Sequence, residues 1–161
     1  MTRQLRPVEL DFVEVAPVRL VFAAALEASP QAVYRALAED LADWPRWFDA
    51  VSGVVPTRGG DSRDVALRVG VTFEETVLAS DPDSRYAYRV DRTNAPAVTA
   101  LAEEWRILPG PTGGSRVRWT FAVDGPPAAR AFARLTKPGL RHSFHGAMRA
   151  LDLRLARAAT H

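Results

Sequence analysis

The sequence contains no cysteine among its 161 residues, which excludes a disulfide framework and any metal site built on thiolates. It also lacks a large excess of charge of one sign, because 21 Lys and Arg face 19 Asp and Glu, for a formal net charge of +2. Basic and acidic residues are interleaved along the chain, which argues against a nucleic-acid partner. The last predicted helix has a basic flank, which indicates either a solvated face or a patch for an anionic membrane or nucleic acid.

Long apolar runs are also missing, since none approaches the roughly eighteen residues that a membrane-spanning helix requires. The apolar run 18–26 follows three acidic residues and contains Arg19, so we expect a strand there and not a signal peptide. With no membrane span, no signal peptide and no cysteine, the sequence predicts a cytoplasmic protein.

Common catalytic motifs are absent as well. There is no G-x-S-x-G elbow, P-loop or dinucleotide-binding fingerprint, because both glycine pairs stand in turn-like surroundings. His142 and His145 are three residues apart, but a metal site needs a third ligand, and His161 is the one remaining histidine. We therefore expect solvated histidines, and we predict no metal and no cofactor.

The most regular pattern lies at the C-terminus, where apolar side chains recur every three or four residues over 140–159. They form the stripe Leu140, Phe144, Met148, Leu151 and Leu155. This spacing predicts one face of an α-helix, with the arginines on the other side. Because such a face must be buried against another element, we expect it to pack on the strand-like residues upstream.

The residues before this helix predict a sheet. After the strand 18–26, Ser29 can cap a helix that Pro30 begins, and its stripe Val33, Leu37, Leu41 and Trp44 ends before Pro45. Residues 46–51 then predict a second short helix, and 56–63 a turn-rich segment. The remaining strands alternate with a period of two and are joined by short turns, which indicates an antiparallel meander. They are expected at 65–69, 71–79, 86–90, 101–107 and 117–123.

Two further segments complete the chain. Residues 128–137 predict a helix with Ala131, Phe132 and Leu135 on one side. Residues 1–17 form a leader of uncertain structure, in which Leu10, Phe12 and Val15 are expected to dock along an edge of the sheet. We expect a single domain over 1–161.

This order of elements resembles the helix-grip fold of the START/SRPBCC superfamily. LEASPQAVYRALAEDLADWPRWFDAV (26–51) is similar to a signature of its polyketide cyclase/dehydrase branch. FEETVLASDPDSRYAY (73–88) and EEWRILPGPTGGSRVRW (103–119) resemble that branch's glutamate strand and its last hairpin. The resemblance implies an α+β fold, in which a curved antiparallel sheet of about six or seven strands wraps around a long C-terminal helix. Members of the superfamily include binding proteins, transporters and enzymes.

A sheet wrapped around a helix encloses a space that is the first candidate for a ligand site. Alternation predicts an inward-facing lining of aromatic, apolar and acidic side chains. These are Phe22, Phe73, Glu75, Tyr86, Tyr88, Leu101, Glu103, Trp105, Trp119, Phe121, Phe144 and Met148. The aromatic side chains either surround a cavity for a flat or elongated apolar molecule, or meet in the middle and form a solid core.

Glu75 and Glu103 occupy inward positions, where a carboxylate is costly unless it is paired or protonated. One interpretation is a general acid/base or a ligand anchor with a raised pKa, and Glu75 and Tyr86 are the candidate catalytic residues. The alternatives are an ion pair with an arginine, or a shift of one residue that turns Glu74 or Glu104 inward instead.

Three functions are compatible with these patterns. The first is binding of a hydrophobic small molecule, such as a lipid, a quinone or a polyketide-like compound. The second is an aromatase/cyclase-type enzyme that promotes cyclisation and dehydration of a polyketide in the same cavity. The third is an interaction module with a filled core, whose basic helix flank contacts an unknown protein partner.

Overall fold

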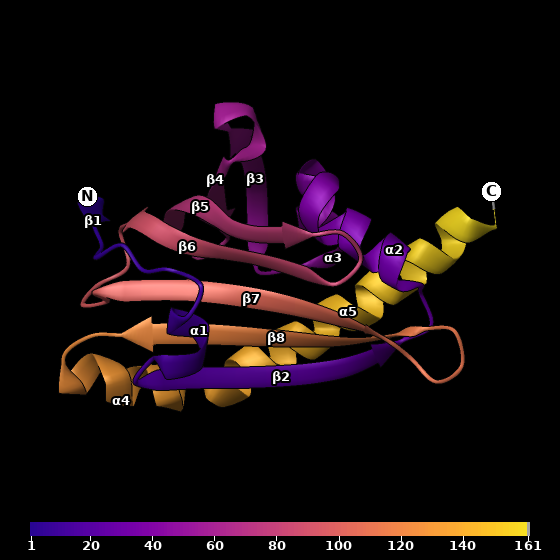
Figure 1. Cartoon of the computed structure of the whole chain (residues 1–161). Coiled ribbons are helices and arrows are strands. Elements are labelled where there is room, and N and C mark those ends of the chain that lie inside the picture. The colour runs from indigo at the N-terminus through magenta and orange to yellow at the C-terminus, as the bar shows by residue number, and fades with distance from the viewer. Residues whose placement is uncertain (161) are drawn as a thin grey trace.

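The computed structural model describes residues 1–160 and contains an antiparallel β-sheet crossed on one face by a long helix (Figure 1). The strands are β1 (Arg3–Gln4), β2 (Val18–Leu26), β3 (Val51–Thr57), β4 (Ser62–Leu67), β5 (Thr72–Asp81), β6 (Arg85–Thr93), β7 (Ala100–Pro109) and β8 (Ser115–Asp124). The α-helices are α1 (Phe12–Val15), α2 (Pro30–Tyr34), α3 (Trp44–Trp47), α4 (Pro127–Leu135) and α5 (Lys137–Ala159). Shorter helical turns are the π-helix η1 (Arg35–Glu39) and the 3₁₀ turns η2 (Leu41–Asp43) and η3 (Arg58–Gly60).

The sheet has the predicted topology. Within residues 1–160, seven strands follow the order β2-β8-β7-β6-β5-β4-β3, and β1 pairs with β6 outside this path. Strands β3 to β8 form a meander because short turns join them. The first long strand, β2, pairs with the last strand from Val18 opposite Val123 to Leu26 opposite Ser115. The predicted helix-grip fold is therefore confirmed.

The turns around β4 differ in detail from the prediction. Ser62 and Arg63 belong to β4 and not to a loop, whereas Val69 lies beyond the strand with 85% of its surface exposed. Gly70 follows with a φ of +92°, in the left-handed region that favours glycine.

The segment between β2 and β3 begins as predicted, because the backbone N–H of Ala32 donates to Ser29 Oγ at 3.2 Å. The prediction of one helix ending before Pro45 is wrong. The chain leaves helical geometry at Asp40, with φ −89° and ψ +55°, and Pro45 stands in the first turn of α3, where its missing N–H costs nothing. Val51, predicted in a helix, is the first residue of β3.

Helix α5 packs its predicted stripe on the concave face of the sheet, where Phe144, Met148 and Leu151 are at most 2% exposed. Asp152 fixes the helix to the link between β2 and α2. Its carboxylate accepts from the backbone N–H groups of Glu27 and Ala28, each at 3.0 Å.

The N-terminal leader fills a gap in the sheet. Strands β6 and β7 diverge at one end, and the leader crosses between them (Figure 1). The backbone N–H of Leu5 donates to the carbonyl of Asp91 at 2.8 Å, and that of Arg6 donates to the carbonyl of Thr99 at 2.9 Å. The Leu5 side chain is 4% exposed and belongs to the main core.

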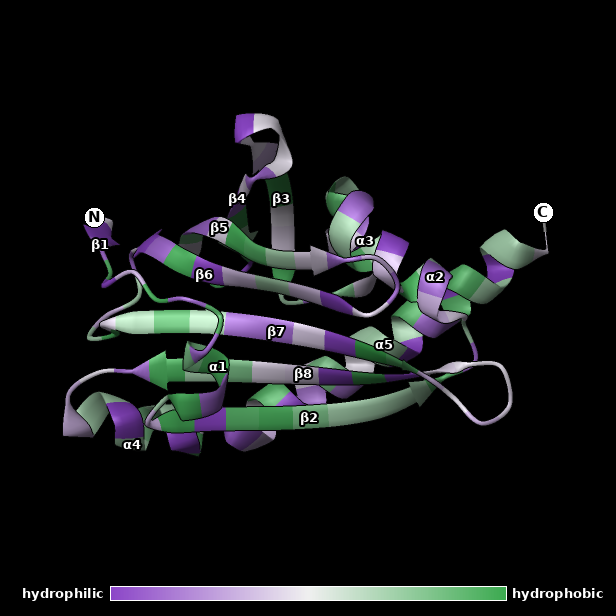
Figure 2. Ribbon diagram, in the orientation of Figure 1, coloured by the Kyte–Doolittle hydropathy of each residue, from purple (hydrophilic) through white to green (hydrophobic). Residues whose placement is uncertain are grey.

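Helix α1 covers the opposite face of the sheet from α5. Phe12 and Val13 pack there with neighbouring residues and with alanines of β7 and β8, at strand ends that Figure 2 colours as hydrophobic. The prediction that this leader docks along an edge of the sheet is therefore wrong, because its apolar residues pack on a face of the sheet. It is also wrong for Val15, which is 71% exposed.

Helix α4 leaves its expected apolar side in solvent, with Phe132 at 68% and Leu135 at 78% exposure. Ala133 packs against the main core instead. Among residues 1–160, no helix is both long enough and apolar enough to cross a membrane.

Candidate ligand-binding site

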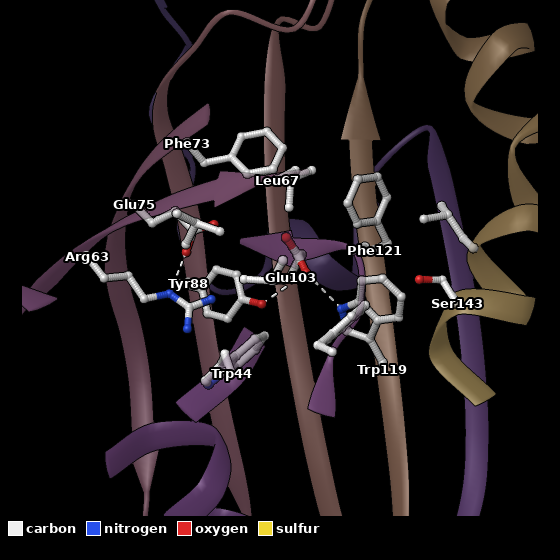
Figure 3. Close-up of a pocket in the computed structure, with 15 residues that line it drawn as sticks. Trp44, Arg63, Leu67, Phe73, Glu75, Tyr88, Glu103, Trp119, Phe121 and Ser143 are labelled. Atoms are coloured by element: carbon white, nitrogen blue, oxygen red, sulfur yellow. Dashed lines mark hydrogen bonds and ion pairs between the residues drawn. The ribbon is translucent and has the colours of Figure 1, made fainter. Parts of the chain in front are cut away.

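A cavity of about 140 Å³ lies between the concave face of the sheet, the α3 segment and the start of α5 (Figure 3). Its floor is buried and includes Trp44 and Tyr88, whereas Leu67, Phe73 and Phe121 are partly exposed. An apolar cavity of roughly 150 Å³ accommodates benzene, so this space is the size of one aromatic ring.

The predicted lining residues divide into two equal groups. Those that line the cavity are Phe73, Glu75, Tyr88, Glu103, Trp119 and Phe121. The others do not line it and are buried in the main core: Phe22, Tyr86, Leu101, Trp105, Phe144 and Met148. Trp105 stacks on Trp119 with 5.3 Å between ring centroids, and Phe22 lies 5.9 Å from Phe144. Solid packing and an open cavity therefore occupy different parts of the same interior.

Sequence reasoning missed several lining residues, chiefly Trp44, Phe48, Arg63, Leu140 and Ser143. The signal for Arg63 was present, because Arg63 has the same parity as Val65 and Leu67 and so points to the same face of β4. Its place beside a Gly-Gly turn concealed this alternation. Phe48 lies at the C-terminal end of α3, in a segment whose contacts depend on the turn at Asp40.

Arg63 and Glu75 face each other across β4 and β5 and form an ion pair, with Nε and Oε2 2.6 Å apart. Both side chains are at most 2% exposed. The guanidinium carbon lies 3.9 Å from the ring centre of Tyr88 and 4.7 Å from that of Trp44. Burial lowers the pKa of Arg63, but Glu75 and the tyrosines outweigh burial and raise it, so the guanidinium keeps its charge.

The two carboxyl groups of the cavity resist ionisation. Burial raises the pKa of Glu75 to about 8, because the desolvation cost and the nearby Glu103 exceed the stabilisation by Arg63. Burial likewise raises the pKa of Glu103. Two carboxyls beside one guanidinium form a neutral group when they retain one proton between them.

Glu103 is held by a chain of hydrogen bonds. Tyr88 Oη donates to Glu103 Oε1 at 3.0 Å, and Trp119 Nε1 donates to the same oxygen at 2.9 Å (Figure 3). Trp105 Nε1 donates to Tyr88 Oη at 3.1 Å. These partners fix the carboxyl at the cavity wall. Tyr86, predicted as a candidate catalytic residue, does not line the cavity. Its ring centre lies 5.4 Å from the guanidinium carbon of Arg63.

The inward glutamates are Glu75 and Glu103. Glu74 is exposed and pairs with Arg92 at 2.9 Å. Glu104 is buried too, but it does not line the cavity, and its carboxylate lies 3.2 Å from Arg106. Both inward glutamates therefore have partners in the interior. Glu75 pairs with an arginine, and Glu103 accepts hydrogen bonds from uncharged side chains.

The two histidines of α5 lie apart from this site. His142 is exposed, and the ring of His145 lies 5.2 Å from that of Phe144. In the part of the chain that the structure describes, no three His, Cys, Asp or Glu side chains are grouped to hold a metal ion. His161, considered above as a third ligand, lies outside the described residues.

Comparison with known proteins agrees with this architecture. The profile of a family described as "Polyketide cyclase / dehydrase and lipid transport" matches residues 17–160. The chain belongs to this polyketide cyclase/dehydrase family. Uncharacterized proteins of Mycobacterium tuberculosis and Mycobacterium bovis are each 33% identical over 160 residues, which cover 94% of this chain and 95% of theirs.

Solved structures show the same fold at low identity. The Zhui aromatase/cyclase of a Streptomyces species has a TM-score of 0.71 at 16% identity, covering 88% of this chain and 95% of that one. A START superfamily protein of Mycobacterium smegmatis has a TM-score of 0.68 at 11% identity, covering 87% and 98%. The two-domain aromatase/cyclase BexL has a TM-score of 0.73 at 20% identity, covering 84% of this chain and 47% of its own. The chain therefore shares its fold with START proteins and with aromatase/cyclases.

Proposed function

We propose that this protein binds a small hydrophobic molecule in the cavity between the sheet and α5. The observation that carries the proposal is the composition of the wall. Aromatic and aliphatic side chains surround a few converging polar groups, namely Arg63, Glu75 and Glu103. Pockets for small molecules have this character, because apolar walls supply affinity and a few polar groups fix orientation.

The size of the cavity bears on which hydrophobic molecule binds. About 140 Å³ fits one ring, which favours a quinone-like or polyketide-like ring over a lipid chain lying wholly inside. The partly exposed residues Leu67, Phe73 and Phe121 form the mouth. A ligand larger than one ring would place its ring at the floor and extend its remaining part through this mouth.

Native mass spectrometry of freshly purified protein tests the proposal, followed by extraction and identification of any bound molecule. We expect a stoichiometric apolar compound, or, if the site is emptied during purification, tight binding of an environment-sensitive hydrophobic dye. Protein that carries no compound and binds no dye would refute ligand binding and favour a filled interior.

A second candidate function is an aromatase/cyclase-type reaction, and the acid/base pair of the cavity favours it. In an aldol condensation, a carboxylate takes a proton from the carbon next to a ketone, and that carbon attacks a second carbonyl. A carboxylic acid then protonates the new alkoxide, and dehydration removes a further proton and the hydroxyl as water. Glu75, protonated near neutral pH, and Glu103 can divide these roles, with Arg63 beside the developing oxyanion.

Incubation with a linear poly-β-ketone model substrate of at least three ketones, long enough to close a six-membered ring, tests this activity, and mass spectrometry follows the loss of one water. We expect Glu75→Gln to lower the rate by about 100-fold or more, the range that general acid–base catalysis supplies. The neighbouring variant Glu74→Gln, which changes an exposed carboxylate, should keep the wild-type rate. Equal rates in both variants would remove Glu75 from the mechanism.

A further inference from the structure

The polar groups of the cavity wall have unused hydrogen-bonding capacity. Among residues 1–160, the buried Nη1 of Arg63 has no hydrogen-bond partner. Glu75 uses Oε2 in its pair with Arg63, and Glu103 uses Oε1 for both of its donors. The wall therefore combines a guanidinium with spare donor capacity and two carboxyl groups with one oxygen each to spare. Because buried polar groups normally find partners, this pattern points to a ligand that both donates and accepts hydrogen bonds.

The charge of the site restricts the ligand further. Arg63 already has two carboxyl groups beside it, Glu75 at 2.6 Å and Glu103 in the same cavity wall, and these three groups are neutral together when the two carboxyls retain one proton. A ligand carboxylate would bring a third acid to one guanidinium and would have to displace Glu75 or take up a further proton. An uncharged ligand requires neither change.

The shape of the site favours a ring. The walls include Trp44, Phe48, Trp119 and Phe121, and the rings of Phe48 and Trp119 lie edge to face at 6.1 Å. Aromatic walls stack well on a flat ring, and about 140 Å³ leaves room for one.

We infer that the ligand bound here carries an uncharged ring with a phenolic or enolic hydroxyl, and that the cavity rejects ring carboxylates of the same size. The hydroxyl hydrogen is donated to a carboxyl oxygen of Glu103 or Glu75, and the hydroxyl oxygen accepts from Arg63. This inference rests on the proposed function, because it names the chemical class of the molecule that the cavity binds.

Titration of the wild-type protein with four probes tests the inference: phenol, resorcinol, toluene and benzoate, at neutral pH. Binding is followed by tryptophan fluorescence, since Trp44 and Trp119 line the cavity, and by calorimetry. We expect phenol and resorcinol to bind at least about tenfold more tightly than toluene, which lacks the hydroxyl, and at least about 100-fold more tightly than benzoate, in line with the cost of leaving buried polar groups unpaired.

Two variants test whether Glu103 is the group that binds the ligand hydroxyl. Glu103→Gln should weaken phenol binding by about tenfold and leave toluene binding unchanged, because the loss concerns the hydroxyl alone. Glu74→Gln, on the outer side of the same sheet, should change neither. Thermal melts of each variant identify any that is unfolded, and the ligand series on the wild-type protein decides the question by itself.

The outcomes separate this inference from the proposed function. Benzoate binding as tightly as phenol would overturn the exclusion of carboxylates, and toluene equal to phenol would overturn the role of the hydroxyl. Either result leaves a hydrophobic site in place. Failure of all four probes, together with failure to bind a hydrophobic dye, would overturn the ligand-binding proposal as well.

Discussion

Arg63 and Glu75 define the electrostatics of the interior at the scale of single residues. The register of β4 and β5 sets them opposite each other, and neither side chain contacts appreciable solvent. Removing one member of a buried ion pair typically costs about 3–5 kcal/mol, because the other is left uncompensated. Glu75 can also lose its charge by taking up a proton, since its pKa is about 8.

The first prediction concerns the pH dependence of stability. Glu75 titrates near 4.5 in the unfolded chain and near 8 in the folded protein, so between these values only the folded state holds the proton. The free energy of unfolding should therefore fall as pH rises through this window and level off above it. Glu75→Gln should make the decline of Tm with pH shallower. Part of the decline should remain, because the pKa of Glu103 is raised as well.

Thermal melts across this pH range provide the measurement, and Glu74→Gln is the matched control. Glu74 is exposed, so its variant should show the wild-type slope. If Glu75→Gln and Glu74→Gln give the same slope as the wild-type protein, Glu75 does not hold a proton that the unfolded chain loses.

At the scale of elements, the N-terminal leader is a structural part of the sheet. Its backbone bridges β6 and β7 where they separate, and Leu5 occupies the main core. Helix α1, with Phe12 and Val13, covers an apolar area on the other face. Sheets with an apolar face require such a cover, because exposed alanines and backbone between β7 and β8 would otherwise remain hydrated.

The second prediction follows from the burial of Leu5. Leu5→Ala should lower the free energy of unfolding by about 2–5 kcal/mol, the range for large-to-small changes in a core. Val15→Ala, in the same leader but 71% exposed, should change it by less than about 0.5 kcal/mol. Urea unfolding of the two variants measures both values, and equal effects would contradict the role of Leu5 in closing the sheet.

At the scale of the whole molecule, the sheet separates two apolar regions of different character. The outer region, under α1, is small and made largely of alanines. The inner region, under α5, contains most of the aromatic residues and leaves the cavity at the end near α3. Ligand binding at this place would connect the sheet, α3 and α5, and would stabilise the folded state by mass action.

The third prediction tests this arrangement by filling the cavity from α5. Ser143→Leu places a larger apolar side chain in the cavity, so the affinity for a hydrophobic dye or ligand should fall by at least about tenfold while Tm stays equal or rises. His142→Leu, at the adjacent exposed position, makes a similar gain in helix propensity and should leave binding unchanged. Dye titration with parallel thermal melts measures both quantities. Undiminished binding in Ser143→Leu would place the ligand elsewhere.

The sequence by itself determined the elements whose signals are local. Periods of two and of three to four residues identified most of the strands and the buried stripe of α5, because burial on one face imposes that spacing. Ser29 and Pro30 identified a helix start, because capping involves neighbouring residues only. The alternation of the strands also predicted that Glu75 and Glu103 point inward. Because each is adjacent to a second glutamate, Glu74 or Glu104, a shift of one residue remained possible in both strands.

Tertiary structure decided what depends on distances between elements. Alternation states which side chains face inward, but the gap between the sheet and α5 determines that Trp119 and Phe121 border a cavity while Phe22 and Trp105 pack in the core. The register of two strands selected Arg63 as the partner of Glu75. The place of residues 1–17 depended on the divergence of β6 and β7, which arises only when the whole sheet has curved around its helix.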